Sequence, residues 1–428
     1  MIRHARRHSP STLPAIAGSG LLVTAVAVLL ALQPWEAAPR DPATLAATPG
    51  TSVTAAPAPA PATTPTKSPD ADFTIVATGD VLLHVPVIAS AKVGNGYDFS
   101  PLLAPLDPWV QGADLALCHL EVPIAPAGVS PSGYPVFGAP AQIAADLKEQ
   151  GWDGCSTASN HSIDRGFAGV TATLDALDTA GLGHVGTARS AVEAAQPQLY
   201  RLQREGQTIT VAHLAVTYGT NGIAIDPKRP WSVALIDVPT IVARATEARA
   251  AGADLVVVSI QSGTEYVTEP SAAQVQVDQE LADSGVVDLI IGHHVHVPQP
   301  LAHLSGGPRG EGMWVAYGLG NYISNQDSNC CSPKTDSGLL LTAHVVKPAD
   351  GPARVSLVEW TGITVDRLGH HRVYALPAAT SGVGTLRAAE IATRAQRVAQ
   401  AVGNTAPERT SPVVSTGPPP LVVARSAG

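Results

Sequence analysis

The sequence predicts an α/β domain in which β-sheets are buried between layers of helices. Short, wholly apolar runs such as residues 255–260 (LVVVSI) are typical of strands that are buried on both faces. These runs alternate along the chain with segments of helical periodicity, and that alternation is typical of parallel sheets covered by helices.

The first half of the domain is expected to alternate between strands and helices. Gly181 and Gly285 each follow a helical pattern and mark its end, and Pro270 opens the second of these helices. In chain order, we expect strands over residues 73–78, 113–118 and 154–157, a helix over 167–180, a strand over 255–260, a helix over 270–284, and a strand over 286–291.

The second half is expected to hold consecutive strands that form a second sheet packed on the first. No helical pattern separates them, and a last amphipathic helix is predicted over residues 384–402. The expected strands cover residues 298–304, 313–317, 337–346 and 354–361.

The N-terminus predicts a single-pass anchor in the cytoplasmic membrane. Residues 13–32 carry no charge, and a helix needs roughly 20 such residues to cross a bilayer. A basic segment precedes this run, so the remainder of the chain is expected outside the cytoplasm. A cleaved signal peptide is the alternative, but Trp35 and Glu36 interrupt the small residues that cleavage needs, which favours an anchor over residues 1–36. The basic segment contains Arg3, Arg6 and Arg7.

Proline content sets the domain boundaries. Residues 37–72 hold eight prolines among alanine and threonine and predict an extended linker. The folded domain is expected over residues 73–404, and a disordered tail is expected over 405–428, where prolines recur.

Charge and cysteine content narrow the range of functions that the sequence indicates. The formal net charge is −9 over 428 residues, which provides no electrostatic footprint for nucleic acid. The four cysteines form no CxxC pair, so a zinc ribbon is not indicated. Buried thiols and disulfides both stay open as interpretations of Cys118, Cys155, Cys330 and Cys331.

Polar side chains that can bind metal gather where the predicted strands end. In α/β sheets, ligands bind beyond the carboxyl ends of strands. Carboxylate, amide and imidazole donors together suit one or two divalent ions such as Mn, Fe, Zn or Mg, and a carboxylate such as Asp80 can bridge two of them. The strand-end residues are Asp80, His119, Glu121, Asn160, His161, Asp164, Gln261, Glu265, His293, His294, His296 and Asn321.

Six ordered sequence blocks resemble the CapA-type capsule-synthesis family, a branch of the calcineurin-like metallophosphoesterase superfamily. The blocks are ATGDVLLH (77–84), ADLALCHLEVPI (113–124), SNHSIDRG (159–166), VVVSIQSGTEY (256–266), DLIIGHHVHVPQP (288–300) and YGLGNYISNQ (317–326).

The resemblance implies a four-layer α-β-β-α sandwich with a metal site at one edge. Position by position, it implies metal binding by Asp80, Glu121, Asn160, His294 and His296, and catalysis by His161 with Asp164 from the same motif. Residues expected to contact substrate or to support the ligands are His293, Gln261, Glu265, Asn321 and Arg165.

Two blocks depart from the family pattern. The second reads His119-Leu120-Glu121 where the family usually has Asn-Leu-Glu, and the fourth has Gln261 where the family usually has histidine. Since a neutral glutamine is a poor ligand for a transition metal, one metal position is expected to be weakened. Our hypothesis is that His119 partly compensates as an additional ligand.

The resemblance implies extracytoplasmic work on a poly-γ-glutamate-type capsule polymer, in its synthesis, export or retention. Expected partners are an anionic polymer or phosphoester substrate, the cytoplasmic membrane through residues 13–32, and capsule-synthesis membrane proteins, with no nucleic acid. A metal-dependent hydrolase is the first functional interpretation. A non-catalytic envelope scaffold on a degenerate version of the fold is the second.

Overall fold

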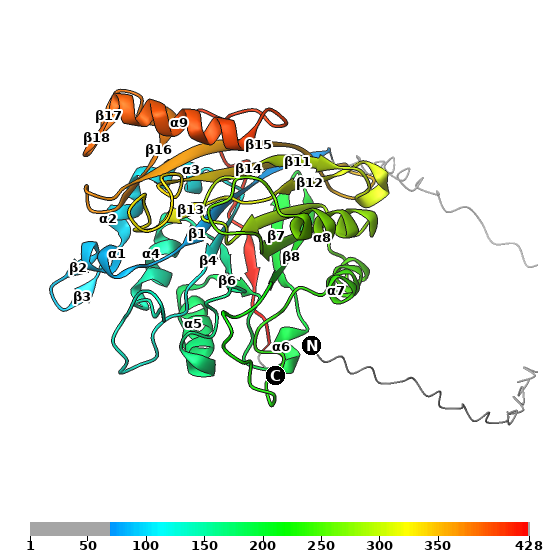
Figure 1. The fold of residues 1–428 in the computed structure, drawn as a ribbon. Coiled ribbons are helices and arrows are strands. Elements are labelled where there is room, and N and C mark those ends of the chain that lie inside the picture. Colours follow the sequence, from blue (N-terminus) through cyan, green and yellow to red (C-terminus); the bar gives the residue numbers. More distant parts are fainter. Residues whose placement is uncertain (1–68, 427–428) are drawn as a thin grey trace, which may run out of the picture. The chain divides into compact units, whose positions relative to one another are not determined.

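The computed structural model describes residues 69–426 (Figure 1). The expected anchor over residues 1–36 and nearly all of the expected linker over 37–72 lie outside the described residues. Among the described residues, no helix is both long enough and apolar enough to cross a membrane. The α/β class is confirmed, since two large mixed sheets are combined with helices.

The first sheet is built around β1, which runs through its middle. Parallel strands follow β1 on one side in the order β4-β5-β6, and antiparallel strands follow on the other in the order β14-β15-β16, with β13 pairing with the end of β1. The bounds are β1 (Ala71–Val81), β4 (Leu115–Leu120), β5 (Gly154–Ser156), β6 (Gly183–Val185), β13 (Asn321–Ile323), β14 (Ser337–Lys347), β15 (Arg354–Asp366) and β16 (Arg372–Ala375).

The second sheet has the strand order β11-β12-β10-β9-β8-β7-β19. Its central strands β8, β9, β10 and β12 run parallel, and the outer strands are antiparallel to their neighbours. The bounds are β7 (Gln198–Arg204), β8 (Gln207–Thr217), β9 (Leu255–Gln261), β10 (Leu289–His293), β11 (Leu301–Leu304), β12 (Met313–Ala316) and β19 (Leu421–Val423).

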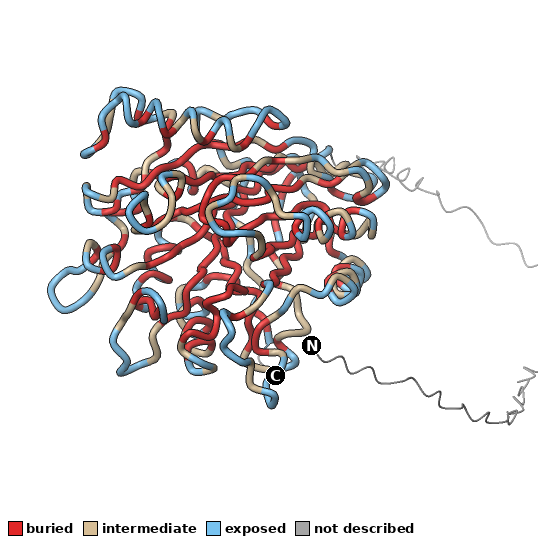
Figure 2. The backbone as a smooth tube through the Cα atoms, in the orientation of Figure 1, coloured by how far each residue is buried: buried red, intermediate tan, exposed pale blue. Residues whose placement is uncertain are grey.

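The two sheets face each other across a shared apolar core. Because side chains alternate between the faces of a strand, Ile75 of β1 and Val257 of β9 point into the space between the sheets, whereas Val76 and Val256 point outward. Figure 2 shows buried backbone running through both sheets. The architecture therefore has two sheets packed face to face, with helices on the outer faces.

Helices cover both outer faces. On the first sheet lie α2 (Ser100–Leu103), α3 (Asp107–Gln111), α4 (Gln142–Gln150) and α5 (Gly166–Ala180). On the second lie α7 (Val238–Ala250) and α8 (Ala272–Asp283). The helix α9 (Ala388–Val402) instead packs on the inner face of β14 and β15, where its buried side chains join the core shared by the two sheets.

Short elements complete the fold. They are α1 (Val85–Ser90), β2 (Lys92–Val93), β3 (Gly96–Tyr97), η1 (Ala104–Leu106), α6 (Ala191–Ala194), η2 (Pro308–Gly310), η3 (Leu376–Ala378), β17 (Gly382–Val383) and β18 (Leu386–Arg387).

The expectation that the four late strands form one second sheet is wrong. β14 runs antiparallel to β1 from Ala71 to Thr78, so the segments near 337–346 and 354–361 extend the first sheet. Only β11 and β12 join the second sheet. The apolar pattern identified the strands, but the pairing follows from backbone hydrogen bonds that the pattern does not encode.

The expectation of a disordered tail after residue 404 is also wrong. β19 pairs with the edge strand β7, and Arg425 lies buried with its guanidinium donating to the carbonyls of His184 and Glu193. The backbone N–H of Thr416 donates to the buried carboxylate of Asp114. These hydrogen bonds order a segment that is rich in proline.

The cysteines form two disulfides. Cys118 of β4 pairs with Cys155 of the neighbouring strand β5, and both are buried. Cys330 and Cys331 pair with each other in a loop.

Candidate metal centre

The register of the two sheets brings the strand-end residues together. Asp80 of β1 lies opposite His119 of β4 on one side and opposite Asn321 of β13 on the other. In the second sheet, Gln261 of β9 lies opposite His293 of β10. Because the carboxyl ends of parallel strands share one edge of a sheet, the two edges together supply one cluster of buried polar groups.

Two glycines permit the close approach of β13 to β1. A Cβ atom on Gly79 would lie 1.8 Å from the carbonyl oxygen of Gly320, so a larger residue at position 79 does not fit. Gly320 has a φ of +67°, a conformation that glycine adopts readily. The backbone N–H of Asp80 donates to the Gly320 carbonyl at 2.9 Å, which fixes Asn321 beside Asp80.

His296 connects three of the cluster's side chains. Its Nδ1 lies 3.0 Å from Oδ2 of Asp80 and 3.1 Å from Oδ1 of Asn321. Its Nε2 lies 3.8 Å from Oε1 of Glu121. All four residues are almost completely buried.

The imidazoles of His119 and His293 stack on each other beside the same aspartate. Their ring centroids are 4.0 Å apart, and Nδ1 of His293 lies 3.6 Å from Oδ1 of Asp80. The Nδ1 atom of His119 is held by the hydroxyl of Ser156 at 2.7 Å.

Two groups of potential ligand atoms therefore share Asp80. We call Asp80, His119 and His293 the histidine-rich group, and Asp80, Glu121 and His296 the carboxylate-rich group. Within each group, one donor atom from each residue lies within 4.8 Å of the others.

Unpartnered atoms support the fit of this cluster to a divalent cation. A buried polar atom without a hydrogen bond costs about 1–3 kcal/mol, and several such atoms at one place indicate a missing partner. Those without a partner are Asp80 Oδ1, His119 Nε2, Glu121 Oε2, Gln261 Oε1 and both ring nitrogens of His293.

Electrostatics in the cluster follow from burial and close pairing. Burial acts to raise the pKa of Asp80, but the close imidazoles of His293 and His296 outweigh it and hold that pKa far below its usual range. Burial acts to lower the pKa of His296, but the carboxylates of Glu121 and Asp80 raise it to about 9. Burial also raises the pKa of Glu121 well above its usual range. The protein alone thus balances Asp80 with a protonated His296.

Gln261 lies at the centre of an amide network. Its Nε2 donates to Oε1 of Glu121 at 3.2 Å and to Oδ1 of Asn160 at 2.8 Å. Asn160 in turn donates from Nδ2 to Oδ1 of Asn221 at 3.2 Å.

His161 and Asp164 form a dyad at the rim of the cluster. Nδ1 of His161 lies 2.7 Å from Oδ2 of Asp164, so the carboxylate orients the ring. Nδ2 of Asn221 lies 3.4 Å from Nε2 of His161. Sequence reasoning missed Asn221 because it missed β8, the strand that ends four residues earlier at Thr217.

Three further predicted site residues make contacts away from the two groups. His294 packs its ring against Tyr218 at 4.6 Å between centroids, whereas its neighbour His293 is the one that faces Asp80. Arg165 donates from Nε to the carbonyl of Phe137 and so supports the neighbouring loop. Glu265 lies on the wall of an adjoining groove.

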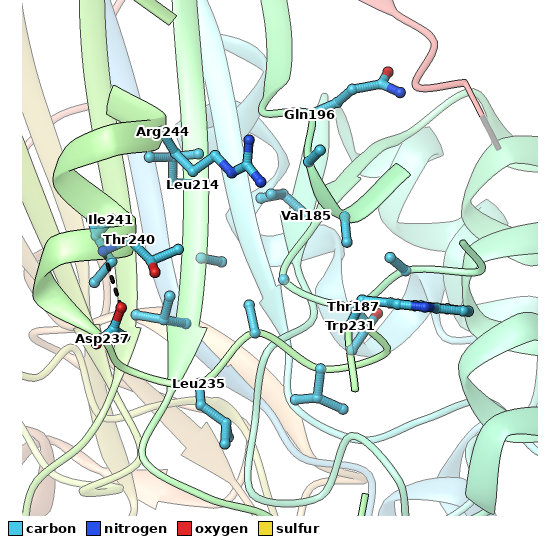
Figure 3. Close-up of a pocket in the computed structure, with 18 of the residues that line it drawn as sticks. Val185, Thr187, Gln196, Leu214, Trp231, Leu235, Asp237, Thr240, Ile241 and Arg244 are labelled. Atoms are coloured by element: carbon cyan, nitrogen blue, oxygen red, sulfur yellow. Dashed lines mark hydrogen bonds between the residues drawn. The ribbon is translucent and has the colours of Figure 1, made fainter. Parts of the chain in front are cut away.

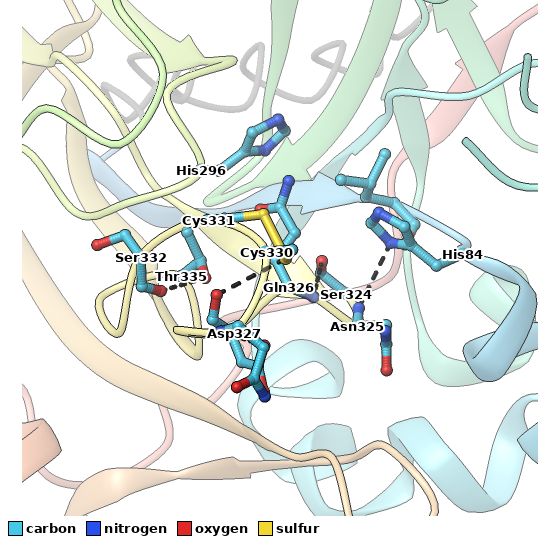
Figure 4. The surroundings of a disulfide bond; sticks show 12 residues. His84, His296, Ser324, Asn325, Gln326, Asp327, Cys330, Cys331, Ser332 and Thr335 are labelled. Carbon is cyan, nitrogen blue, oxygen red and sulfur yellow. Dashed lines mark hydrogen bonds between the residues drawn. A yellow bond between two sulfur atoms is a disulfide. The ribbon is translucent and has the colours of Figure 1, made fainter. Parts of the chain in front are cut away.

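The groove has a volume of about 690 Å³ and leads to the carboxylate-rich group through His296. The Cys330–Cys331 disulfide lies on its wall, and Figure 4 shows it near His296 and His84. Among the described residues that line the groove there is no lysine or arginine. Six of its lining residues are Tyr134, Phe137, His161, Glu265, Tyr266 and His296.

A separate cavity of about 260 Å³ lies between β6, the end of β8 and the start of α7. Figure 3 shows Leu214, Ile241 and Trp231 on its walls, with Arg244 at one side. None of the strand-end residues lines it. This cavity is distinct from the candidate metal centre.

Fold and donor set together define an α/β protein with a candidate divalent-metal site at the edge of two facing sheets. The chain belongs to the family described as "Bacterial capsule synthesis protein PGA_cap", whose model matches residues 74–326. The six sequence blocks that suggested this family fall within that range.

Curated relatives carry capsule-related names. The chain is 28% identical over 214 residues to "PGA biosynthesis protein CapA" of Bacillus subtilis, covering 50% of this chain and 52% of the relative. It is 29% identical over 183 residues to "Capsule biosynthesis protein CapA" of Bacillus anthracis, covering 42% of each. A "Probable polyglutamine synthesis accessory protein" of Mycobacterium tuberculosis is 28% identical over 239 residues, covering 50% of this chain and 61% of the relative. The match thus spans about half the length of these relatives.

Solved structures give more distant similarities. The NAD nucleotidase of Haemophilus influenzae superposes with a TM-score of 0.45 at 11% identity, covering 80% of this chain and 65% of that one. A 5'-nucleotidase precursor of Thermus thermophilus superposes with a TM-score of 0.42 at 16% identity, covering 77% and 58%.

Proposed function

We propose that this protein is a metal-dependent hydrolase that acts outside the cytoplasmic membrane on a poly-γ-glutamate-type capsule polymer. The observation that carries the proposal is the convergence of Asp80, Glu121 and three histidines in one buried cluster with unpartnered donor atoms. Membership of the capsule-synthesis family supports the polymer as substrate. The domain then has the four-layer architecture of calcineurin-like metallophosphoesterases.

The cluster's own residues would hold one or two divalent ions such as Mn, Fe, Zn or Mg. Asp80 belongs to both groups, so it would hold an ion together with His119 and His293, or together with Glu121 and His296. When bound, such a cation supplies positive charge that polarises a carbonyl or phosphoryl oxygen of the substrate.

His161 is placed to move the proton that bond cleavage requires. Asp164 accepts a hydrogen bond from Nδ1–H of His161, which leaves Nε2 as the proton-transfer atom. Both residues line the groove, so Nε2 can protonate a leaving group of a bound substrate. Asn221 contacts both His161 and Asn160 and positions the ring relative to the cluster.

The groove fits an extended chain bound beside the metal centre. Since no lysine or arginine lines it among the described residues, a bound cation would supply the positive charge that attracts an anionic polymer or phosphoester. Residues 13–32 would anchor the chain in the membrane, with capsule-synthesis membrane proteins as neighbours.

The test measures hydrolysis by the purified full-length protein. Poly-γ-glutamate and a chromogenic phosphodiester are the substrates, with and without a chelator. We expect chelation to abolish turnover and added divalent metal to restore it. His161→Ala should lower kcat about 100-fold or more, as is typical for loss of a general acid. His303→Ala, an exposed histidine outside the cluster, is the matched control. Turnover that is indifferent to both chelation and Asp80→Ala would refute the proposal.

The second candidate function is a non-catalytic scaffold that holds polymer at the membrane. One observation favours it: Gln261 takes a position where the family usually has histidine, and its amide donates to two oxygens of the cluster. A scaffold predicts that polymer retention in cells survives His161→Ala but is lost when residues 1–36 are removed. Retention that is unchanged after release from the membrane would exclude this function.

A further inference from the structure

The side chain of His119 has the arrangement of a metal ligand rather than of a core histidine. It is fully buried, and its Nδ1 is held by the Ser156 hydroxyl at 2.7 Å, whereas its Nε2 has no partner. Metal-bound histidines almost always have the other ring nitrogen held in this way, because the hydrogen bond fixes the tautomer and the ring orientation.

His293 and Asp80 complete a site around that free nitrogen. Both ring nitrogens of His293 and Oδ1 of Asp80 are buried without a hydrogen bond. One donor atom from each of the three residues lies within 4.8 Å of the other two. A dry pocket that leaves these atoms unpartnered is unfavourable, and a single cation would satisfy one donor atom of each of the three residues.

The carboxylate-rich group offers fewer unpartnered donor atoms to a cation than the histidine-rich group does. Oε1 of Glu121 already accepts a hydrogen bond from Gln261, and so does Oδ1 of the nearby Asn160. Nδ1 of His296 is held by Asp80 and Asn321, as Nδ1 of His119 is held by Ser156. Among the buried side-chain atoms of this group, Oε2 of Glu121 and the shared Oδ1 of Asp80 lack a partner, whereas each of the two histidines in the histidine-rich group also has an unpartnered nitrogen.

We propose that Asp80, His119 and His293 form the tighter of two unequal cation positions, and that this position selects a zinc-class ion. Two imidazoles and one carboxylate are one of the three-ligand sets found in catalytic zinc sites, which leave a fourth position open. Imidazole donors favour Zn²⁺, Fe²⁺ or Co²⁺ over Mg²⁺. The inference rests on the proposed metal-dependent function and adds to it a ligand, His119, that compensates for Gln261.

The experiment titrates metal-free full-length protein with Zn²⁺ and with Co²⁺. The readouts are ions retained after gel filtration, affinity by competition with a chromophoric chelator, and the visible absorption of bound Co²⁺. We expect about one tightly held ion in the wild type. His119→Ala should weaken it at least about 100-fold, since loss of a supporting contact alone typically weakens metal binding 10–100-fold. Gln261→His should increase retention of a second ion.

Two further variants keep the inference falsifiable. Ser156→Ala removes the hydrogen bond to His119 but leaves every ligand in place, so it should weaken the first ion by about 10-fold or more. His303→Ala should leave retention unchanged, and circular dichroism checks the fold of each variant. If His119→Ala binds the first ion as tightly as the wild type, the inference is overturned while the proposed hydrolase survives. If the wild type retains no ion, both fail.

Discussion

At the scale of single residues, backbone conformation decides which histidine of the strand-end cluster faces Asp80. The types of the donors and their positions after apolar strands are visible in the sequence. Which histidine faces Asp80 was not visible: His294 and His296 both adopt positive φ, and this irregular backbone turns His293 inward and His294 toward Tyr218.

One aspartate outside the site has a pKa far from the value that is usual for its residue type. Asp278 lies on the buried face of α8, and burial alone raises its pKa to about 8. The folded protein therefore binds a proton that the unfolded chain releases near pH 4. Between about pH 4 and pH 8, the free energy of unfolding should fall as pH rises, by at most about 1.4 kcal/mol per pH unit.

Asp278→Asn keeps the neutral form and should remove this pH dependence. We expect the variant to be more stable than the wild type by about 1 kcal/mol or more at pH 8, with the difference shrinking toward pH 5. Chemical denaturation at both pH values measures it, and Asp283→Asn on the exposed part of the same helix is the control. A stability difference that is equal at pH 5 and pH 8 would contradict a raised pKa.

At the scale of elements, the site depends on strand register. Parallel pairing sets Asp80 beside His119 and Gln261 beside His293, and the sequence predicted these four strand ends from apolar length alone. It did not predict β7, β8 and α7, because their polar and apolar residues do not form the fully apolar runs of the central strands.

The contact between β1 and β13 gives a prediction at this scale. Gly79→Ala places a Cβ atom against the Gly320 carbonyl, 1.8 Å away in the native backbone, so the two strands must separate. Asn321 then moves from its position beside Asp80. We expect a loss of stability of about 1–3 kcal/mol, as for other overpacked sites, together with weaker metal binding. Gly96→Ala, whose added Cβ would meet no atom closer than 3.8 Å, should change neither the melting temperature nor metal retention.

At the scale of the whole molecule, composition was a poor guide to the C-terminal segment. The prolines predicted disorder after residue 404. In the structure, however, this segment packs against the folded domain and supplies hydrogen-bond partners for buried charged side chains. Asp114 pairs with Arg204 at 2.7 Å, and Ser415 and Thr416 donate to the same carboxylate. A charge pair buried without such additional hydrogen bonds would be strongly unfavourable, so the tail belongs to the folded domain.

The two disulfides allow the proposed compartment to be tested on the whole protein. Disulfides persist in oxidising compartments, so a domain outside the cytoplasm should carry the Cys118–Cys155 bond closed in its native cells.

The Cys118–Cys155 bond joins residues 37 positions apart and so restricts the unfolded chain, whereas Cys330 and Cys331 are adjacent and close almost no loop. Replacing Cys118 and Cys155 together by alanine should therefore destabilise the protein by about 2–4 kcal/mol, and replacing Cys330 and Cys331 by serine should have a much smaller effect. Mass spectrometry after trapping free thiols in intact cells measures the redox state, and thermal unfolding measures the stability. If Cys118 and Cys155 are both trapped as free thiols, the extracytoplasmic location loses this support.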